Sequence, residues 1–488
     1  MSVIQSDIPG RLDRLPWSGW HTRVVLALGV AWVLDGLEVT LVGSLGSVLE
    51  RPDTLGLDAI QVGWSGSLYI AGAVVGALVF GRLADRLGRK KLFLMTLALY
   101  MAATLLTAFS TNFVFFSICR FATGLGIGGE YAAINSAIDE LIPARVRGRV
   151  SLAINGSFWL GAALGAAVSL VLLDARVLGP EYGWRAGFAL GAVLALAILL
   201  VRRHVPESPR WLLSHGREAE ALRIVEDIEA QVAAREGGLP PAAGSVTFNR
   251  QAVPTVRQVA HVLLRRYRKR SVVALSMMIS QAFFYNAIFF TYSLVLTRFM
   301  DVPQGRVALY IFPFAAGNVL GPLLLGPLFD HVGRRRMIAL TYVSAGIALA
   351  LTGWAFMAGW LNAGTLALCW SAVFFLASAA ASSAYLTVSE VFPLETRALA
   401  ISIFYAVGTG AGGFVGPVLF GTLIESGSRD AVGAGYAIAA LLVIAAGLLA
   451  LRHGVDAERK PLEEVATPLG AEDNAPAPPR TQAVRTEL

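Results

Sequence analysis

Charged residues are scarce in this 488-residue chain. Asp, Glu, Lys and Arg make up 15% of it, against about a quarter in an average soluble protein, and hydrophobic residues make up 56%. Cysteine is also nearly absent: Cys119 and Cys369 lie in apolar segments of opposite halves, which disfavours a disulfide framework or a thiolate metal site. No catalytic triad, metal cluster or nucleotide-binding loop stands in a suitable context. We therefore predict a polytopic membrane protein that is not an enzyme and uses no cofactor and no metal.

The net charge of +7 does not indicate a nucleic-acid partner. The basic residues cluster at the ends of apolar segments, which is typical of membrane topology rather than of a phosphate-binding face. The sequence "GLGIGG" at 124–129 has the spacing of a dinucleotide fingerprint, but it lies inside a continuous apolar segment instead of after a strand. We expect these glycines to let two helices pack closely.

Twelve segments have the roughly 20 apolar residues that a membrane-spanning helix needs. Helices are expected because lipid offers the backbone no hydrogen-bond partners. The segments are 24–48, 61–80, 92–109, 113–140, 150–173, 184–201, 271–297, 305–329, 337–357, 363–388, 398–424 and 431–451.

The basic residues of the connecting loops give the orientation. Loops 81–91, 143–149, 330–336 and 389–397 carry five, three, three and one Lys or Arg, whereas no loop on the opposite side carries more than one. Since basic loops stay in the cytoplasm, both termini are predicted to be cytoplasmic. We expect the protein to lie in the cell (inner) membrane, as a monomer.

The chain divides into two similar halves. The repeat is visible where "GRLADRLGRKK" (81–91) and "GPLFDHVGRRR" (326–336) each follow the second span of their half. The predicted organisation is a cytoplasmic N-terminal segment, a six-helix bundle, a cytoplasmic linker with a surface helix, a second six-helix bundle and a disordered cytoplasmic tail. Their bounds are 1–23, 24–201, 202–270, 271–452 and 453–488.

These motifs and the 6+6 duplication resemble the major facilitator superfamily, over about residues 20–452. The stretches "RFATGLGIGGE", "VPESPRWL" and "SEVFPLETR" are similar to motifs of its sugar-porter-related branch. The stretch "DGLE" (35–38) resembles the signature of aromatic-acid and metabolite proton symporters and of synaptic-vesicle-protein-like transporters. The resemblance implies an all-α membrane protein with 12 transmembrane helices in two pseudo-symmetric six-helix bundles.

Two carboxylates, Asp35 and Glu38, stand inside the first span. A charge at the centre of a membrane helix costs about 2.5–3.5 kcal/mol, and Asp35 lies about 16 Å into a hydrocarbon core of about 30 Å. Residues i and i+3 share a helix face. The resemblance puts Glu38 and Arg120 at the sugar-porter proton-coupling acid and its span-4 arginine. We expect Glu38 to alternate between a protonated and an Arg120-paired state; a static ion pair is the alternative. Glu130 either joins this proton-coupling set or anchors its helix.

The second half supplies the predicted substrate wall. Gln281 and Asn286 have the five-residue spacing of the sugar-porter polar pair, and Tyr385 stands where sugar porters commonly have tryptophan. Aromatic faces suit a flat or partly apolar ligand, and amides orient it by hydrogen bonds. Ordinary aromatic packing is the alternative. Further pocket candidates are Asn155, Trp159 and Tyr292.

The resemblance implies a gate built from the repeated loop motifs, which would hold the cytoplasmic side shut. Simple topogenic charges, or a helix stop at "PESPRWL", are the alternatives. The candidate gating residues are Gly81, Asp85, Arg86, Gly88, Arg89, Asp330, Gly333, Arg334, Glu207, Arg210, Glu390 and Arg397.

Together these features predict a secondary transporter that works by alternating access, with its site between the halves. The expected activity is proton symport that takes up a small organic metabolite, which we expect to be a carboxylate or aromatic acid before a sugar. Proton-driven efflux of drugs or metabolites, and a sensor that binds without transporting, are the alternatives.

Overall fold

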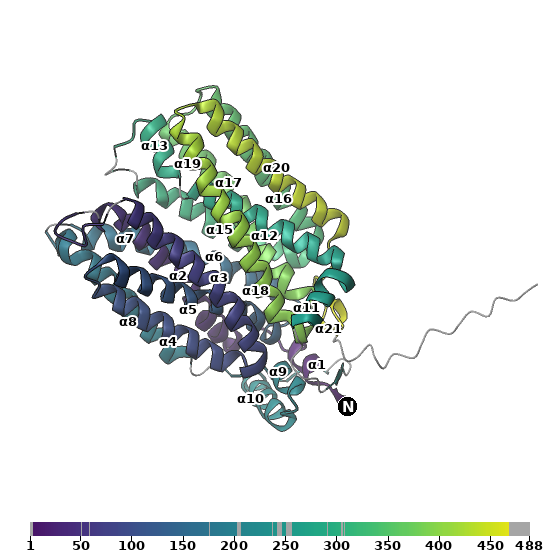
Figure 1. Cartoon of the computed structure of the whole chain (residues 1–488). Helices are drawn as coiled ribbons and strands as arrows, with labels where there is room; N and C mark the ends of the chain where they lie inside the picture. The colour runs from purple at the N-terminus through teal and green to yellow at the C-terminus, as the bar shows by residue number, and fades with distance from the viewer. Residues whose placement is uncertain are drawn as a thin grey trace, which may run out of the picture.

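The structure is a computed structural model and describes the chain except for short gaps and the end of the tail. The described residues are 3–49, 51–57, 59–174, 176–202, 206–236, 238–241, 246–249, 256–289, 291–303, 306 and 308–467. They form two six-helix bundles that lie side by side with their helices roughly parallel (Figure 1).

The N-terminal half carries the first six spans, and the fifth is interrupted at Ser157. Its helices are α2 (Gly19–Leu49), α3 (Ala59–Leu87), α4 (Arg89–Ala108), α5 (Phe113–Leu141), α6 (Arg147–Gly156) continued by α7 (Phe158–Leu172), and α8 (Gly179–Arg202).

The C-terminal half repeats this order, and its eleventh span contains a π-helical turn at a run of glycines. Its helices are α12 (Arg268–Phe289) followed by α13 (Tyr292–Phe299), α15 (Ile311–His331), α16 (Arg334–Met357), α17 (Ala363–Glu390), α18 (Arg397–Gly408) continued through η4 (Thr409–Gly413) into α19 (Phe414–Glu425), and α20 (Arg429–His453).

The twelve predicted spans all fall on helices. Ten of them are long and apolar enough to cross a membrane on the described residues alone. The other two, α2 and α5, have 31 and 29 residues, which is ample for a bilayer. They are also the helices that carry Asp35, Glu38, Arg120 and Glu130.

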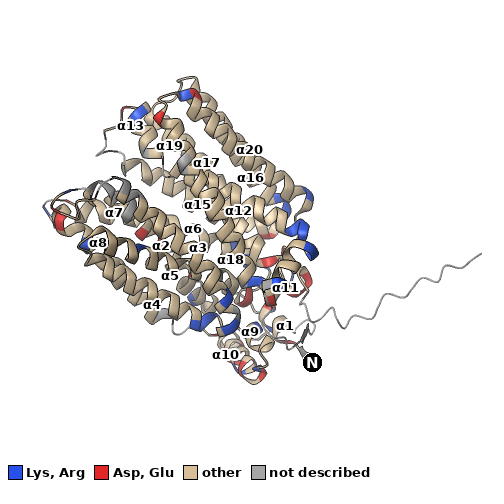
Figure 2. Ribbon diagram, in the orientation of Figure 1, with Lys and Arg blue, Asp and Glu red and all other residues tan. Residues whose placement is uncertain are grey.

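Smaller elements gather at one end of the bundles, where Figure 2 shows many of the charged residues. We call this the charged end: it carries α1, α9, α10 and α21 and the first residues of α4, α6, α16 and α18. The elements are β1 (Val3–Ser6), α1 (Ile8–Asp13), α9 (Pro209–Ser214), α10 (Glu218–Glu236), β2 (Val246–Asn249), α11 (Val256–His261), η1 (Val262–Arg266), η3 (Leu394–Thr396) and α21 (Leu462–Val465). A last short element, η2 (Ala308–Tyr310), precedes α15. The strands β1 and β2 pair antiparallel, which the all-helical prediction did not include.

The prediction that the tail is disordered from residue 453 is wrong for its first part. Residues 454–467 have a defined course, with Leu462 and Val465 of α21 buried and Glu463 bonded to Arg210. Arg270 also donates to the Val465 carbonyl at 2.8 Å, so apolar, ionic and hydrogen-bond contacts together dock a segment whose composition is otherwise polar. The rest of the tail, 468–488, lies outside the described residues.

Close helix approach in the N-terminal half depends on glycine, as the sequence predicted. A Cβ on Gly124 of α5 would lie 2.0 Å from the carbonyl oxygen of Tyr69 in α3, and one on Gly128 would lie 1.9 Å from that of Ala73. The second half repeats the arrangement, because a Cβ on Gly321 of α15 would lie 1.9 Å from the carbonyl oxygen of Phe375 in α17. These contacts set the positions of the side chains that α3 and α5 present to α2.

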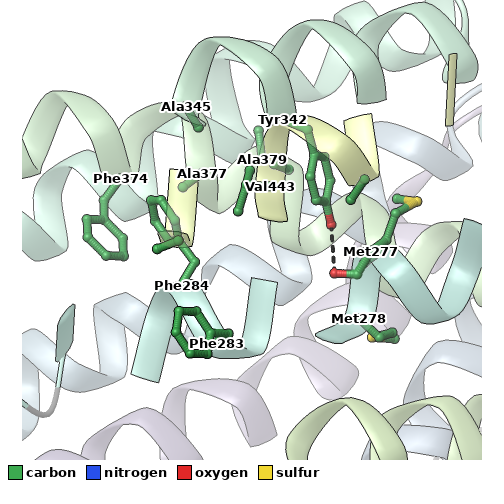
Figure 3. Packing of buried hydrophobic residues seen from close by; sticks show 14 of the residues in the cluster. Met277, Met278, Phe283, Phe284, Tyr342, Ala345, Phe374, Ala377, Ala379 and Val443 are labelled. Atoms are coloured by element: carbon green, nitrogen blue, oxygen red, sulfur yellow. Dashed lines mark hydrogen bonds between the residues drawn. The ribbon is translucent and has the colours of Figure 1, made fainter. Parts of the chain in front are cut away.

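The largest hydrophobic core lies in the C-terminal half (Figure 3). Met277, Phe283 and Phe284 of α12 pack against neighbouring spans, and the Tyr342 hydroxyl of α16 donates a hydrogen bond to the Met277 carbonyl at 3.3 Å. Phe284 also packs on Phe374 of α17, with ring centroids 5.3 Å apart. Such close packing makes this half resist deformation.

Gly124→Ala is expected to destabilise the N-terminal half by forcing α3 and α5 apart, at a cost of about 1–3 kcal/mol for overpacking. The matched control is Gly66→Ala in α3, where nothing lies within 4 Å of an added Cβ, so alanine should be neutral or mildly stabilising. Thermal unfolding of both variants in detergent measures the difference. Equal melting temperatures for the two variants would contradict the role of Gly124.

Candidate functional site

Asp35 and Glu38 are both buried in the N-terminal half, each with 1% of its surface exposed. They share a face of α2 but have different partners. Asp35 is held by tyrosines of α3 and α5, and Glu38 by residues of α4 and α5. Neither carboxylate faces lipid.

The Glu38 carboxylate forms an ion pair with Arg120. One oxygen accepts a hydrogen bond from Arg120 Nη1, and the other accepts one from the Thr104 hydroxyl at 3.2 Å. Arg120 is itself only 1% exposed, and its guanidinium carbon lies 4.5 Å from the centre of the Tyr69 ring. The predicted pairing of Glu38 with Arg120 is thus present in the structure, inside the N-terminal bundle.

Both oxygens of Asp35 accept hydrogen bonds from tyrosine hydroxyls. Tyr69 of α3 donates to Oδ1 at 2.7 Å, and Tyr131 of α5 donates to Oδ2. Tyr69 therefore contacts both acidic sites, because its ring lies against Arg120 while its hydroxyl reaches Asp35. The two sites are physically connected although they share no direct hydrogen bond among those found.

An aromatic cluster joins Asp35 to the C-terminal half. Tyr131 stacks on Trp32 with ring centroids 4.6 Å apart, and its other side lies 4.7 Å from the Tyr405 ring of α18. Tyr385 of α17 completes the cluster, at 5.9 Å from Trp32 and 6.4 Å from Tyr405. Two of these rings belong to each half, so the cluster lies between the halves.

The predicted polar pair of α12 lies near the same interface. Gln281 lies beside the hydroxyl of Tyr385. The Asn286 amide donates to the Ala282 carbonyl of its own helix at 2.7 Å and lies next to Gly413 of η4. Both side chains are only partly buried, so they can still contact a ligand.

Trp159 of α7 also contacts the C-terminal half. Its ring lies 5.2 Å from Phe289 and 5.1 Å from Phe314 of the C-terminal half. Next to these rings Tyr292 lines a small apolar pocket, which is formed by Phe289, Tyr292, Tyr310, Ile311, Phe314, Ala367 and Trp370. Asn155 is placed differently: its amide bonds Ser151 and Asn135 inside the N-terminal half, at 2.8 and 3.4 Å. Glu130 is 2% exposed and close enough to Asp35 to influence it electrostatically.

The repeated loop motif builds the same arrangement twice at the charged end. Arg89 donates to Glu140 at 2.9 Å and to the Ala84 carbonyl at 3.1 Å. In the C-terminal half, Arg334 donates to both oxygens of Glu390 at 2.9 and 3.0 Å, and to the Phe329 carbonyl at 2.8 Å.

A glycine with positive φ precedes each arginine and an acid caps the helix that follows. Gly88 (φ +93°) and Gly333 (φ +114°) adopt a conformation that disfavours other residues. Glu207 accepts hydrogen bonds from the backbone of Arg89 and Lys90, at 2.8 and 3.2 Å. Burial raises the pKa of Glu207 even though backbone N–H groups, including that of Ser208, act in the opposite direction.

Asp330 connects the two halves. Its carboxylate accepts hydrogen bonds from the backbone N–H groups of Gly148 and Arg149, at 3.0 and 2.8 Å, and so caps the start of α6 in the other half. Beside it, Arg147 of α6 lies 3.7 Å from Glu390 of α17. Both contacts hold the halves together at the charged end.

Arg210 holds three further segments together. It is fully buried and donates to Glu463 of the tail at 2.9 Å, to the Glu140 carbonyl at 2.6 Å and to Asp13 of α1 at 3.0 Å. Burial alone would raise the pKa of Glu463, but the charge of Arg210 prevails and lowers it.

The remaining predicted gate residues are less engaged. Gly81 is buried in α3, Arg86 is exposed, and Arg397 is buried with a single hydrogen bond found, to the Phe392 carbonyl at 3.4 Å. The side chain of Asp85 lies outside the described residues.

The tyrosines around Asp35 were not predicted from the sequence. Tyr69, Tyr131 and Tyr405 are spread over three spans, and nothing in their local patterns separates them from ordinary packing aromatics. The available signal was weak: a buried carboxylate needs donors, and tyrosine is a common donor in apolar spans.

Comparisons with known proteins agree with this geometry. The family model described as "Sugar (and other) transporter" matches residues 40–467. The niacin transporter NiaP of Acinetobacter baylyi is 27% identical over 94% of this chain and 99% of its own length. The 4-hydroxybenzoate transporter PcaK of the same organism is 26% identical over 85% and 88%. The putative metabolite transport protein YdjK of Escherichia coli is 31% identical over 67% and 70%.

Among solved structures, the chain is similar to the major facilitator superfamily proton:xylose symporter XylE bound to a bromo-deoxyglucose. The TM-score is 0.74 at 20% identity, over 91% of this chain and 98% of that one. This likeness confirms the predicted fold. Because the family model covers most of the sequence and the spans, the halves and the loop motifs all agree with it, this membrane protein is a transporter, not an enzyme, and belongs to the sugar (and other) transporter family.

Proposed function

We propose that this protein is a proton-coupled symporter that imports a small organic acid, with an aromatic carboxylate as the favoured class. The observation that carries the proposal is the buried pair of Glu38 and Arg120 in the middle of the N-terminal bundle. A carboxylate and a cation that are both removed from water are stable only together. Protonation of Glu38 breaks that balance and changes the charge of the site.

The proton and the conformation are coupled through this change. Protonated Glu38 no longer neutralises Arg120, so the guanidinium must move or find another acceptor. This movement acts directly on Tyr69, because the Tyr69 ring contacts Arg120 and its hydroxyl donates a hydrogen bond to Asp35. We assign Asp35 as the second acid of the coupling site, because Tyr131 links it to Tyr405 in the C-terminal half. Glu130 acts on this site through its charge.

The substrate site lies between the halves, where aromatic rings from both sides meet. Trp32 and Tyr131 supply one wall, and Tyr385 and Tyr405 supply the other. Flat faces of this kind suit an aromatic ring, and the nearby amides of Gln281 and Asn286 suit its polar substituents. The names of the relatives, which transport niacin and 4-hydroxybenzoate, support the same class.

The charged end is assigned to the cytoplasm and the membrane to the inner, or cell, membrane, with the chain acting as a monomer. The positive-inside rule supports the first assignment, because the basic loops lie at that end. The contacts of Asp330 and Arg147 across the halves then close the cytoplasmic side. Alternating access requires those contacts to break in the inward-open state.

Uptake into proteoliposomes is the test of the proposed function. We expect 4-hydroxybenzoate or nicotinate to be accumulated when the outside is acidic, by up to about tenfold for each pH unit and each coupled proton. Xylose and a cationic drug serve as competitors of other classes. Accumulation driven by an alkaline exterior would indicate efflux exchange, and binding without flux would indicate a sensor; either result contradicts the proposal.

Glu38→Gln is expected to abolish accumulation but to keep exchange of substrate between the two sides. Glutamine has the size of glutamate but cannot bind and release a proton, so Arg120 loses its pH-dependent partner. The matched control is Glu181→Gln, which makes the same change at an exposed position of α8. Full proton-driven accumulation by Glu38→Gln would exclude Glu38 from coupling.

Asp330→Ala is expected to weaken closure of the cytoplasmic side, because two N–H groups of α6 and one hydrogen bond of Arg334 lose their acceptor. Breaking a buried charge contact of this kind costs about 3 kcal/mol. Distances between spin labels at Lys91 and Arg336, which are exposed in opposite halves, report the open population. Asp430→Ala, an exposed acid at the start of α20, is the control. Unchanged distances in Asp330→Ala would contradict the role in closure.

A further inference from the structure

Asp139 is a buried carboxyl group that the proposed transport mechanism does not use. It lies near the end of α5, at the charged end, with 1% of its surface exposed. Neither of its oxygens has a hydrogen-bond partner among the described residues. An unpartnered buried carboxylate is costly, so its protonation state needs an explanation.

Charged groups surround Asp139 from several elements; among them are Arg210 of α9, which donates to the Glu140 carbonyl, and Glu463 of α21 beside it. Arg147 faces it from α6, Glu390 from α17 and Arg397 from α18. On its own helix Glu140 is already bonded to Arg89 of α4.

Most of these neighbours are engaged with one another. Glu390 receives two hydrogen bonds from Arg334 and lies 3.7 Å from Arg147, which also approaches Asp13 at 3.6 Å. Two nitrogens of Arg397, Nε and Nη1, and two of Arg147, Nε and Nη2, have no hydrogen-bond partner in the described part of the chain. Arg397 is thus close enough to interact electrostatically with Asp139, but it forms no hydrogen bond with the Asp139 oxygens.

Comparison of the two pseudo-symmetric halves shows that Asp139 has no acidic counterpart in the C-terminal half. Glu140 and Arg147 are seven residues apart, as are Glu390 and Arg397, and each pair flanks a proline in its loop. The residue before Glu390 is Ser389, where the first half has Asp139. The shared gate positions are therefore complete without an acid at 139.

Ser389 is also the polar neighbour of Asp139 across the interface. Its hydroxyl donates a hydrogen bond to the Leu386 carbonyl at 2.9 Å, so its single hydrogen is already used. Ser389 therefore leaves the Asp139 oxygens without a hydrogen bond by geometry, and a buried carboxyl group without a donor is less costly when it is neutral.

We infer that Asp139 is a second proton-binding site, which holds a proton while the halves are closed at the charged end. When the halves separate, water reaches the carboxyl group; the O–H bond breaks, the proton passes to the water, and the carboxylate stays behind hydrated. The inference rests on the proposed function only for alternating access. It makes the gate itself sensitive to the pH of the compartment that it faces.

The closed-to-open ratio of the gate tests this site, with spin labels at Lys91 and Arg336 and with Cys369 replaced by serine. The measurement is made without substrate in a background with both Glu38→Gln and Asp35→Asn, so that neither acid of the coupling site at the membrane centre titrates. A proton bound only in the closed state changes the ratio by up to about tenfold per pH unit. We expect closure to weaken as the pH rises, and Asp139→Asn to stay closed at every pH.

Two results would overturn the inference. If Asp139 is an ionised counter-ion of Arg397, Asp139→Asn opens the gate at every pH. If another group senses pH, the slope persists in Asp139→Asn. Ser389→Ala is the second variant: it removes the polar neighbour but no charge, so the pH dependence should persist with a shifted midpoint, and an unchanged titration would also count against the site. Loss of uptake in the parent protein would instead contradict the proposed function and leave the gate titration to be judged separately.

Discussion

The requirement that no charge be left alone in hydrocarbon governs the N-terminal half. Removing one member of a buried ion pair costs about 3–5 kcal/mol, so Glu38 and Arg120 stay paired unless protonation of Glu38 makes Arg120 find another acceptor. Their pair explains why α2 and α5 tolerate ionised residues near the middle of the membrane. It also explains why the site can respond to a proton, since neutralising one partner removes what stabilises the other.

Comparing the two halves of the chain separates the residues that support the fold from the residues proposed to give transport its direction. Where the halves agree, they build the same gate contact, as Arg89 with Glu140 and Arg334 with Glu390 show. Where the halves differ, the candidate functional side chains occur in one half only. The first half places acids on α2 and the second places the amide pair of α12, so the proposed proton site lies in one half while the proposed substrate site takes residues from both. If the two halves carried the same side chains at the interface, those side chains would not separate a proton site from a substrate site.

Sequence reasoning reached the features that depend on composition or on a repeated motif, and missed those that depend on how helices pack. The spans follow from hydropathy, and the pairing of Glu38 with Arg120 followed from a family resemblance. Tyr69 and Tyr131 could not be found in this way, because their approach to Asp35 is set by backbone contacts at Gly124 and Gly128. The docked tail was missed for a similar reason: contacts with distant segments, such as those of Arg210 with Glu463 and of Arg270 with the Val465 carbonyl, outweigh a polar local composition.

The spacing of the two acids on α2 gives the coupling its direction. Three residues place Glu38 deeper in the bundle beside Arg120, and Asp35 beside the rings that reach the other half. Tyr69 spans the gap, with its ring on the cation and its hydroxyl on the second acid. In the proposed mechanism, a movement of Arg120 changes the donor that holds Asp35, and Tyr131 passes the change to Tyr405. A proton taken up inside one bundle would in this way alter the contact between the two bundles without itself crossing the interface.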